Sequence, residues 1–228
     1  MTVPLRKALD DFALLAVEGQ DTLANQPGID GPWEVDLEAG WLRIGQVTFE
    51  VALIGSSSSR DNSWMWGWCN RAFGPQHPAV APILVGRETA RRVGVVEFAL
   101  ETFSLNGLSD YGMHPGSGVA FMAARLSGLT AIYCGPYDGG VAYFGIRGLE
   151  LPPPDPVAFP RLAGMAGAFS EDHRQTIGQY GRMRGLNPTV PPEGGITLNY
   201  PGGSRLTCSF DGWNRLTRIT GNVSAPPQ

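Results

Sequence analysis

Short stretches in which apolar and polar residues alternate predict strands near both ends of the chain. In the N-terminal part, Trp33–Ile44 alternates on either side of a Glu-Ala-Gly turn, and residues 47–54 form a third apolar stretch. In the C-terminal part, residues 196–219 contain three alternating stretches separated by Pro-Gly-Gly and Asp-Gly turns. These patterns predict an N-terminal hairpin followed by a strand, and a C-terminal three-stranded meander with one solvated face.

A tryptophan-rich segment is the most distinctive pattern in the chain. Its order is Trp-Met-Trp-Gly-Trp-Cys-Asn, so three of the six tryptophans occupy alternate positions. We predict a strand over residues 63–69, because alternate side chains of a strand share one face. Trp64, Trp66 and Trp68 then form a row beside Asn70. Such a row is either the spine of a core or the wall of a binding groove, and the alternation does not choose between them.

Apolar residues at helical spacing predict helices between these strands. The predicted helices cover residues 4–25, 79–93, 118–129 and, weakened by several glycines, 159–183. Further extended segments are expected at residues 95–98, 131–134 and 141–146.

Helices interleaved with antiparallel hairpins predict an α+β fold. We expect an antiparallel sheet built from the N- and C-terminal hairpins and the Trp-rich strand, with three or four packed helices. The whole chain, residues 1–228, is predicted to form a single α+β domain. Within it, the Pro-rich linker 151–156 joins a later helix and the C-terminal meander.

Composition narrows the possible functions. A formal net charge of −4 and a pI near 5.4 argue against nucleic acid as a partner. Lys7 is the only lysine and no Gly-rich loop precedes it, which disfavours phosphate-loop and lysine-nucleophile chemistry. No apolar run reaches the length of a membrane span, and three scattered cysteines without a CxxC pair suit a reduced, cytoplasmic protein.

The segment Gly135-Pro136-Tyr137-Asp138-Gly139-Gly140 is a candidate site in a loop. It is either a tight connection between two strands, in which Asp138 bonds its own backbone amides, or a pocket mouth at which Tyr137 and Asp138 form a hydrogen-bonding pair. The three histidines and three cysteines lack the spacing of a metal site, so we expect no metal and no cofactor. A Cys–His pair such as Cys134 with His114 stays open, because such pairs assemble in space rather than in sequence.

Three arginines, Arg87, Arg91 and Arg92, lie on the predicted helix 79–93. Cations near a helix C-terminus are favoured by the helix dipole, which explains them without a ligand. The alternative is a surface that binds an anion or an acidic partner.

Several of these segments, with the N-terminal helix, resemble a bacterial family catalogued as domain of unknown function 6882. The segments are the hairpin Trp33–Ile44, residues 53–56, the Trp-rich run 64–70 and residues 133–140. The match spans residues 5 to 183 in order. The resemblance carries no activity or catalytic residue, and it implies a bacterial, intracellular, single-domain protein.

The scarcity of catalytic groups favours binding over catalysis. We predict a non-catalytic bacterial cytosolic binding protein of immunity or antitoxin type, whose partner is a cognate toxin or another protein. One alternative is a small-molecule-binding domain that uses the tryptophan row, and another is an enzyme with a Cys–His or Asp–His pair. The residues expected to bind a ligand or partner are Trp64, Trp66, Trp68, Asn70, Tyr137 and Asp138.

Overall fold

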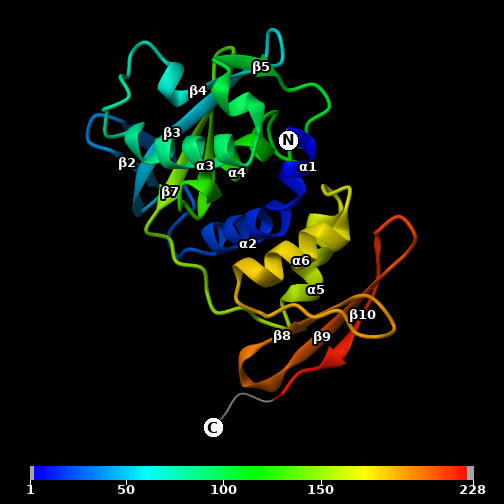
Figure 1. The fold of residues 1–228 in the computed structure, drawn as a ribbon. Helices are drawn as coiled ribbons and strands as arrows, with labels where there is room; N and C mark the ends of the chain where they lie inside the picture. The colour runs from blue at the N-terminus through cyan, green and yellow to red at the C-terminus, as the bar shows by residue number, and fades with distance from the viewer. Residues whose placement is uncertain (1–2, 225–228) are drawn as a thin grey trace. The chain divides into compact units, whose positions relative to one another are not determined.

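The computed structural model describes residues 3–224, and the chain divides into two compact units. The first unit comprises the residues up to Leu9 together with Gly19–Leu151. The second comprises Asp10–Glu18 and the chain from Pro152 onward. Both contain helices and purely antiparallel strand pairs, which confirms the α+β class (Figure 1). That the whole chain forms a single domain stays a prediction.

Over the described residues, the first unit contains a seven-stranded antiparallel sheet. Its strands are β1 (Trp33–Asp36), β2 (Trp41–Ile44), β3 (Val47–Ser58), β4 (Ser63–Trp66), β5 (Thr102–Ser104), β6 (Ala131–Tyr137) and β7 (Gly140–Arg147). The long strand β3 is central: it pairs first with β2 and then with β4 along one edge, and with β7 along the other. The β3–β7 register shifts between Leu53 and Gly55, which marks a β-bulge at Ile54.

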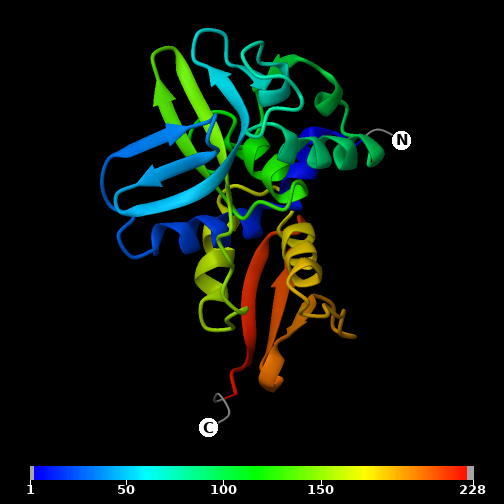
Figure 2. The same ribbon diagram turned by 90° about the vertical axis from the view of Figure 1, so that its left-hand side faces the viewer.

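Helices cover one face of this sheet. The α-helices with residues in the first unit are α1 (Leu5–Asp10), α2 (Ala13–Ala24), α3 (Leu84–Arg92) and α4 (Ser117–Leu126). Short 3-10 helices are η1 (Gly67–Cys69), η2 (Ala81–Ile83) and η3 (Val96–Ala99). Helix α4 packs against β3, β6 and β7, and α3 packs against α4 (Figure 2).

The second unit contains the C-terminal meander. Its elements are α5 (Phe159–Gly167), α6 (His173–Met183), β8 (Ile196–Asn199), η4 (Pro201–Gly203), β9 (Arg205–Phe210) and β10 (Leu216–Asn222). The three strands form a sheet of their own rather than extending the N-terminal sheet as we predicted. The C-terminal strands follow one another through short turns, and each pairs with its neighbour in the chain, β8 with β9 and β9 with β10.

The predicted N-terminal helix over residues 4–25 is broken into α1 and α2 at Asp11 and Phe12. The carbonyls of Leu9 and Asp10, which would accept helical hydrogen bonds from the next turn, accept instead from side-chain hydroxyls. Tyr111 Oη donates to the Leu9 carbonyl at 2.6 Å, and Thr176 Oγ1 donates to the Asp10 carbonyl at 2.9 Å. These distant residues are invisible to a local periodicity argument.

The predicted helix over residues 159–183 is likewise two helices, so the described chain has six α-helices rather than three or four. Asp172 separates them, because its carboxylate accepts a hydrogen bond from the Gln175 backbone at 2.8 Å and caps α6. The segment 95–98, predicted as extended, is mostly the 3-10 helix η3, which buries Phe98.

The Trp-rich strand is shorter than predicted. It ends at Trp66, and Gly67–Cys69 turns into η1. A side chain at Gly67 would place its Cβ 2.2 Å from the Leu53 carbonyl oxygen, so the chain passes against β3 where only glycine fits. The predicted loop 135–140 is mostly strand: β6 and β7 continue to a two-residue Asp138-Gly139 turn, in which Gly139 has a φ of +93°.

Candidate functional site

The two faces of the seven-stranded sheet are built differently. On the covered face, Trp64 and Trp66 are fully buried, with 0% of their surface exposed. Their rings meet edge to face at 5.3 Å between centroids, and the Trp64 ring lies 5.2 Å from that of Tyr143 on β7. Tyr143 Oη donates a hydrogen bond to the Pro115 carbonyl just before α4. This face is therefore a closed aromatic core.

Two glycines make the space that the Trp64 indole fills. A Cβ at Gly55 would lie 2.6 Å from Trp64 Cζ2, and a Cβ at Gly116 would lie 2.9 Å from Trp64 Cε3. Both distances are far below van der Waals contact, so any side chain there would displace the ring. The fit between an indole and two glycines from different elements indicates a structural role for Trp64.

The opposite face, called here the cleft face, is hollow over part of its area. It contains a cleft of about 340 Å³. The residues that line it are Leu37, Leu53, Gly55, Ser56, Met65, Trp66, Gly67, Asn70, Phe73, Tyr137, Ala142 and Phe144. All of them belong to the first unit. The volume lies within the range of roughly 300–1,000 Å³ that is typical of small-molecule pockets.

The cleft exists because small residues meet on adjacent strands. Ser56 on β3 pairs with Met65 on β4 and with Ala142 on β7, so the middle of three strands carries little volume. At the other end of the same face, the space is filled by a cluster of buried side chains. This cluster includes Leu42, Ile44, Phe49, Val51, Leu53, Phe144 and Ile146. The cleft is thus an unfilled continuation of a well-packed core.

The cleft lining is apolar with a few hydrogen-bonding groups. Its polar side chains are those of Ser56, Asn70 and Tyr137, and none of the described lining residues carries a charge. Ser56 and Asn70 are partly buried, whereas Tyr137 is 52% exposed at the rim. Such a lining can hold an apolar molecule and orient it by hydrogen bonds.

The structure separates the six residues that the sequence suggested as a site. Trp66, Asn70 and Tyr137 border the cleft, although the Trp66 indole is buried in the covered face. Trp64 belongs to the core, and Asp138 is exposed in the β6–β7 turn. The tryptophan row could have been either part of a core or the wall of a groove. The indoles of Trp64 and Trp66 are part of the core.

Trp68 lies partly exposed on the side of α3. Its ring stacks on that of Trp66 at 4.5 Å and 13°, and the Arg87 guanidinium lies 5.2 Å from its centroid. Arg87 Nε also donates to the Phe98 carbonyl at 3.4 Å. Arg87 therefore covers Trp68 in a cation–π contact rather than reaching toward a ligand.

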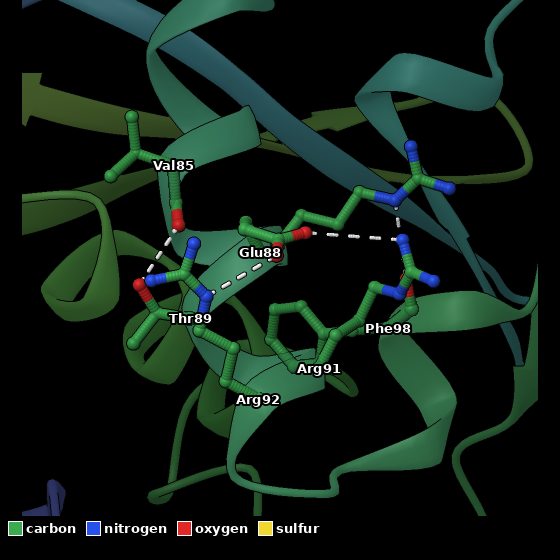
Figure 3. Close-up of polar contacts among 7 residues, drawn as sticks. Val85, Glu88, Thr89, Arg91, Arg92 and Phe98 are labelled. Atoms are coloured by element: carbon green, nitrogen blue, oxygen red, sulfur yellow. Dashed lines mark hydrogen bonds and ion pairs between the residues drawn. The ribbon is translucent and has the colours of Figure 1, made fainter.

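The other two arginines of α3 pair along their own helix (Figure 3). Arg92 Nε lies 3.3 Å from Glu88 Oε1, and Arg91 Nη1 lies 3.9 Å from Glu88 Oε2. Because these side chains are half exposed or more, the pairs stabilise the helix only slightly. A surface that binds an anion stays an untested alternative for them.

The thiols are poorly suited to nucleophilic chemistry. All three cysteines are free, and burial raises the pKa of Cys134 to about 11 and that of Cys208 to about 12. A nucleophilic cysteine needs the opposite shift, toward the thiolate. The neighbour that Cys134 contacts is the Ser117 hydroxyl, 3.9 Å from its Sγ, while His114 is exposed. The hypothetical Cys134–His114 pair therefore gains no support from these contacts.

His77 pairs with a carboxylate beside the cleft. Its Nδ1 accepts a hydrogen bond from the Ala79 backbone at 3.1 Å, and its Nε2 lies 3.2 Å from Glu38 Oε2. Neither His77 nor Glu38 lines the cleft. Within the described part of the chain, no group of three or more His, Cys, Asp or Glu side chains could hold a metal ion. Nor do residues 3–224 include a helix of the length and apolarity needed to cross a membrane.

A second hollow in the first unit is more open in character. It measures about 760 Å³ and includes Glu50 and Arg147, which pair at 3.9 Å. Their side chains are 76% and 50% exposed, so water already solvates the charges. This hollow is open to solvent and its lining mixes charged with apolar side chains, so we do not assign a site to it.

The second unit contains a buried polar network. Glu18 accepts a hydrogen bond from Tyr180 Oη at 3.0 Å, and its other oxygen lies 3.0 Å from Arg184 Nε. Glu18 is only 5% exposed, and burial together with the Glu18 charge raises the pKa of Tyr180. The network pairs a buried charge, as burial requires, and has a structural role.

Sequence reasoning missed most of the cleft lining. Alternation along a strand directs Met65 to the face opposite Trp64 and Trp66, but the sequence analysis did not identify that face as a site. Phe73 and Phe144 come from a loop and from β7, and they had no distinguishing pattern. The one local feature that could have pointed to the cleft is the small side chain of Ser56 within a strand. It indicates unfilled space only once the residues that pair with it on adjacent strands are known.

The family of the chain is shown by a comparison with family models. Residues 6–149 match the family of unknown function DUF6882, so the chain belongs to that family. The match ends well before residue 183, and it lies almost entirely within the first unit, which carries the cleft. Curated proteins and solved structures gave no match to the chain.

Proposed function

We propose that this protein is a non-catalytic binding protein that holds a small molecule in the cleft of its seven-stranded sheet. The observation that carries the proposal is the hollow on the cleft face: about 340 Å³ of space between Met65, Phe73 and Phe144, on a sheet whose other face is closed. A preformed, mostly apolar pocket with a few convergent polar groups is the usual form of a small-molecule site.

The composition of the lining supports binding rather than catalysis. Among the described lining residues, Tyr137 alone carries a titratable group. General acid–base or nucleophilic catalysis needs paired groups within hydrogen-bond reach of each other. The cleft residues can provide apolar contact and hydrogen bonds, which are enough to select and hold a molecule.

A cleft variant with a matched control tests this proposal. Met65→Glu places a carboxylate in the cleft, whereas Met113→Glu makes the same change at a 37% exposed position of the same unit outside the lining. The probe is prodan, an uncharged naphthalene ketone whose emission shifts to the blue in apolar surroundings. We expect the wild-type protein and Met113→Glu to bind prodan, and Met65→Glu to bind it at least tenfold more weakly because an unpaired charge is costly in an apolar site.

Circular dichroism and thermal unfolding of both variants establish that each is folded before binding is compared. Absence of prodan binding to the folded wild-type protein, or equal binding by the two variants, would contradict the proposal.

Binding of a cognate toxin or another protein stays a second proposal from the sequence. It is supported by exposed apolar side chains on α3, on η3 and directly after η3, namely Val85, Val96 and Leu100, which are 64%, 49% and 46% exposed. A bacterial source and a cytoplasmic location belong to the same proposal, and the three free thiols suit a reducing compartment. Affinity purification from the native host with mass spectrometry tests it: a stoichiometric partner supports the proposal, and recovery of the protein alone contradicts it.

A further inference from the structure

The electrostatic character of the cleft limits the charge of its ligand. Its lining includes Leu53, Met65 and Phe144, and none of the described lining residues is a Lys, Arg, His, Asp or Glu. A charged group of a ligand would lose its hydration on entering the cleft and would find no oppositely charged side chain there. Loss of hydration without such a partner is strongly unfavourable for an ion. The lining therefore selects against anions and cations.

The orientation of Asn70 determines which kind of hydrogen bond it can offer. Its Oδ1 accepts a hydrogen bond from the Ala72 backbone at 3.0 Å. Because an amide NH₂ group cannot accept that bond, the identity of the two terminal atoms follows from the contact itself. The Nδ2 group of Asn70 can therefore donate a hydrogen bond to a ligand. A ligand that binds beside it needs a hydrogen-bond acceptor.

The backbone of Asn70 is also held in place. Its N–H donates to the Gly67 carbonyl at 3.2 Å, and its carbonyl accepts from the Phe73 N–H at 3.0 Å. With the side-chain bond to Ala72, three hydrogen bonds fix this residue. A donor that is already positioned loses little conformational entropy when a ligand binds, which makes Asn70 suited to recognition.

Aromatic side chains on separate elements line the same cleft. They are Phe73 in the loop after η1, Tyr137 on β6 and Phe144 on β7. Aromatic rings present broad apolar surfaces and interact well with other rings in offset or edge-to-face contact. A flat, ring-containing molecule suits such walls better than a compact polar one.

From these observations we infer that the cleft recognises an uncharged aromatic molecule through an acceptor group that is hydrogen-bonded by Asn70. The inference rests on the proposed small-molecule function and specifies its ligand class. A ketone, an ether or a ring nitrogen would each supply the acceptor. Asn70 is thus assigned as a specificity-determining residue.

A matched series of naphthalenes tests the charge requirement. The competitors are 2-acetylnaphthalene, which is uncharged with an acceptor, 2-ethylnaphthalene, which is uncharged without one, and 2-naphthoate, which is an anion. Each is titrated against prodan bound to the wild-type full chain. We expect 2-acetylnaphthalene to displace prodan at a concentration at least tenfold lower than 2-naphthoate, and about threefold or more lower than 2-ethylnaphthalene.

The Asn70→Asp variant tests the role of the amide. Aspartate keeps an oxygen for the Ala72 N–H and removes the NH₂ donor, so the local turn is retained. Asn106→Asp is the control, because Asn106 Oδ1 accepts from Asn62 Nδ2 at 2.7 Å and aspartate keeps that acceptor outside the cleft. The affinity of prodan for each variant is measured first, so that competition can be converted into an inhibition constant. The new carboxylate penalises both uncharged competitors, but only the ketone also loses a hydrogen bond. We therefore expect Asn70→Asp to raise the inhibition constant of 2-acetylnaphthalene at least fivefold more than that of 2-ethylnaphthalene, while Asn106→Asp changes neither.

Each outcome has a distinct meaning. If 2-naphthoate competes as well as the ketone, the cleft binds small molecules but the inferred ligand class is wrong. If the ketone and the ethyl compound respond equally to Asn70→Asp, the assignment of Asn70 is wrong. If prodan does not bind to the folded wild-type protein, the proposed function itself fails.

Discussion

Two neighbouring residues of strand β4 point to opposite faces of the sheet, and the two faces are packed differently. Trp64 is fully buried against Trp66, Tyr143 and two glycines, whereas Met65, the next residue, is partly buried and lines a cleft of about 340 Å³. Both side chains are large and apolar, so hydrophobicity does not explain the difference. What differs is the cover: elements around α4 close the first face, and small residues leave the second face unfilled. The position of functional space is thus decided by what lies opposite a side chain.

The largest expected effect separates these two faces by stability. Trp64→Ala removes a fully buried indole between rings that cannot collapse into the space, and we expect a loss of about 3–5 kcal/mol in the free energy of unfolding. Met65→Ala enlarges an existing cleft and should cost about 1 kcal/mol. Urea unfolding followed by tryptophan fluorescence and circular dichroism measures both. Similar losses for the two variants would show that the faces are not packed differently.

A smaller effect comes from a glycine that accommodates the Trp64 ring. Gly116 and Gly107 both have positive φ angles, +96° and +75°, so alanine at either position incurs a left-handed backbone penalty of about 1–2 kcal/mol. At Gly116 the new Cβ also meets Trp64 at 2.9 Å, while at Gly107 nothing lies within 4 Å. We expect Gly116→Ala to be less stable than Gly107→Ala by about 1–3 kcal/mol. Equal midpoints in thermal unfolding would mean that the ring moves freely.

The smallest effect at neutral pH concerns Cys134, whose Sγ approaches the Ser117 hydroxyl of α4. Burial raises its pKa from 9.0 to about 11, so at pH 8 its thiolate fraction is about 100-fold below that of an ordinary thiol. The folded state keeps this proton between pH 9 and 11 while the unfolded state loses it. Stability contributed by Cys134 is therefore present below pH 9 and is lost as the pH rises toward 11.

Two measurements check this prediction. Alkylation by iodoacetamide at pH 8 should be slow at Cys134 until the protein is unfolded. The wild-type protein should also lose more stability than Cys134→Ala when the pH is raised from 8 to 10.5. Rapid alkylation of Cys134 in the folded protein would indicate that the covered face opens readily.

Local pattern predicted many, but not all, elements of the fold. Alternation predicted the N-terminal hairpin, the C-terminal meander and the Trp-rich strand, and helical spacing predicted α4. It failed where a distant group intervenes: α1 ends because Tyr111 and Thr176 take the carbonyl oxygens that the helix would use. The sheet to which the C-terminal meander belongs was also predicted wrongly, because alternation identifies a strand but not the strands beside it; β8, β9 and β10 form a separate sheet.

The residues that the sequence suggested as a site do not all lie on the cleft face. Asn70 and Tyr137 were identified and do border the cleft, whereas Trp64 is core and Asp138 lies in an exposed turn. The tryptophans drew attention because large side chains are conspicuous in a sequence. A cleft is made by side chains that are small or absent, and Ser56 and Ala142 give no local signal.

By itself, the sequence determined the α+β class, the alternation that sends Trp64 and Met65 to opposite faces, and the family to which residues 6–149 belong. These follow from the geometry of a strand and from local hydrophobic periodicity. The tertiary structure alone decided which face is closed and which is hollow, because packing depends on the summed volume of side chains that arrive from separate strands, helices and loops. That sum cannot be formed until the partners of each strand are known.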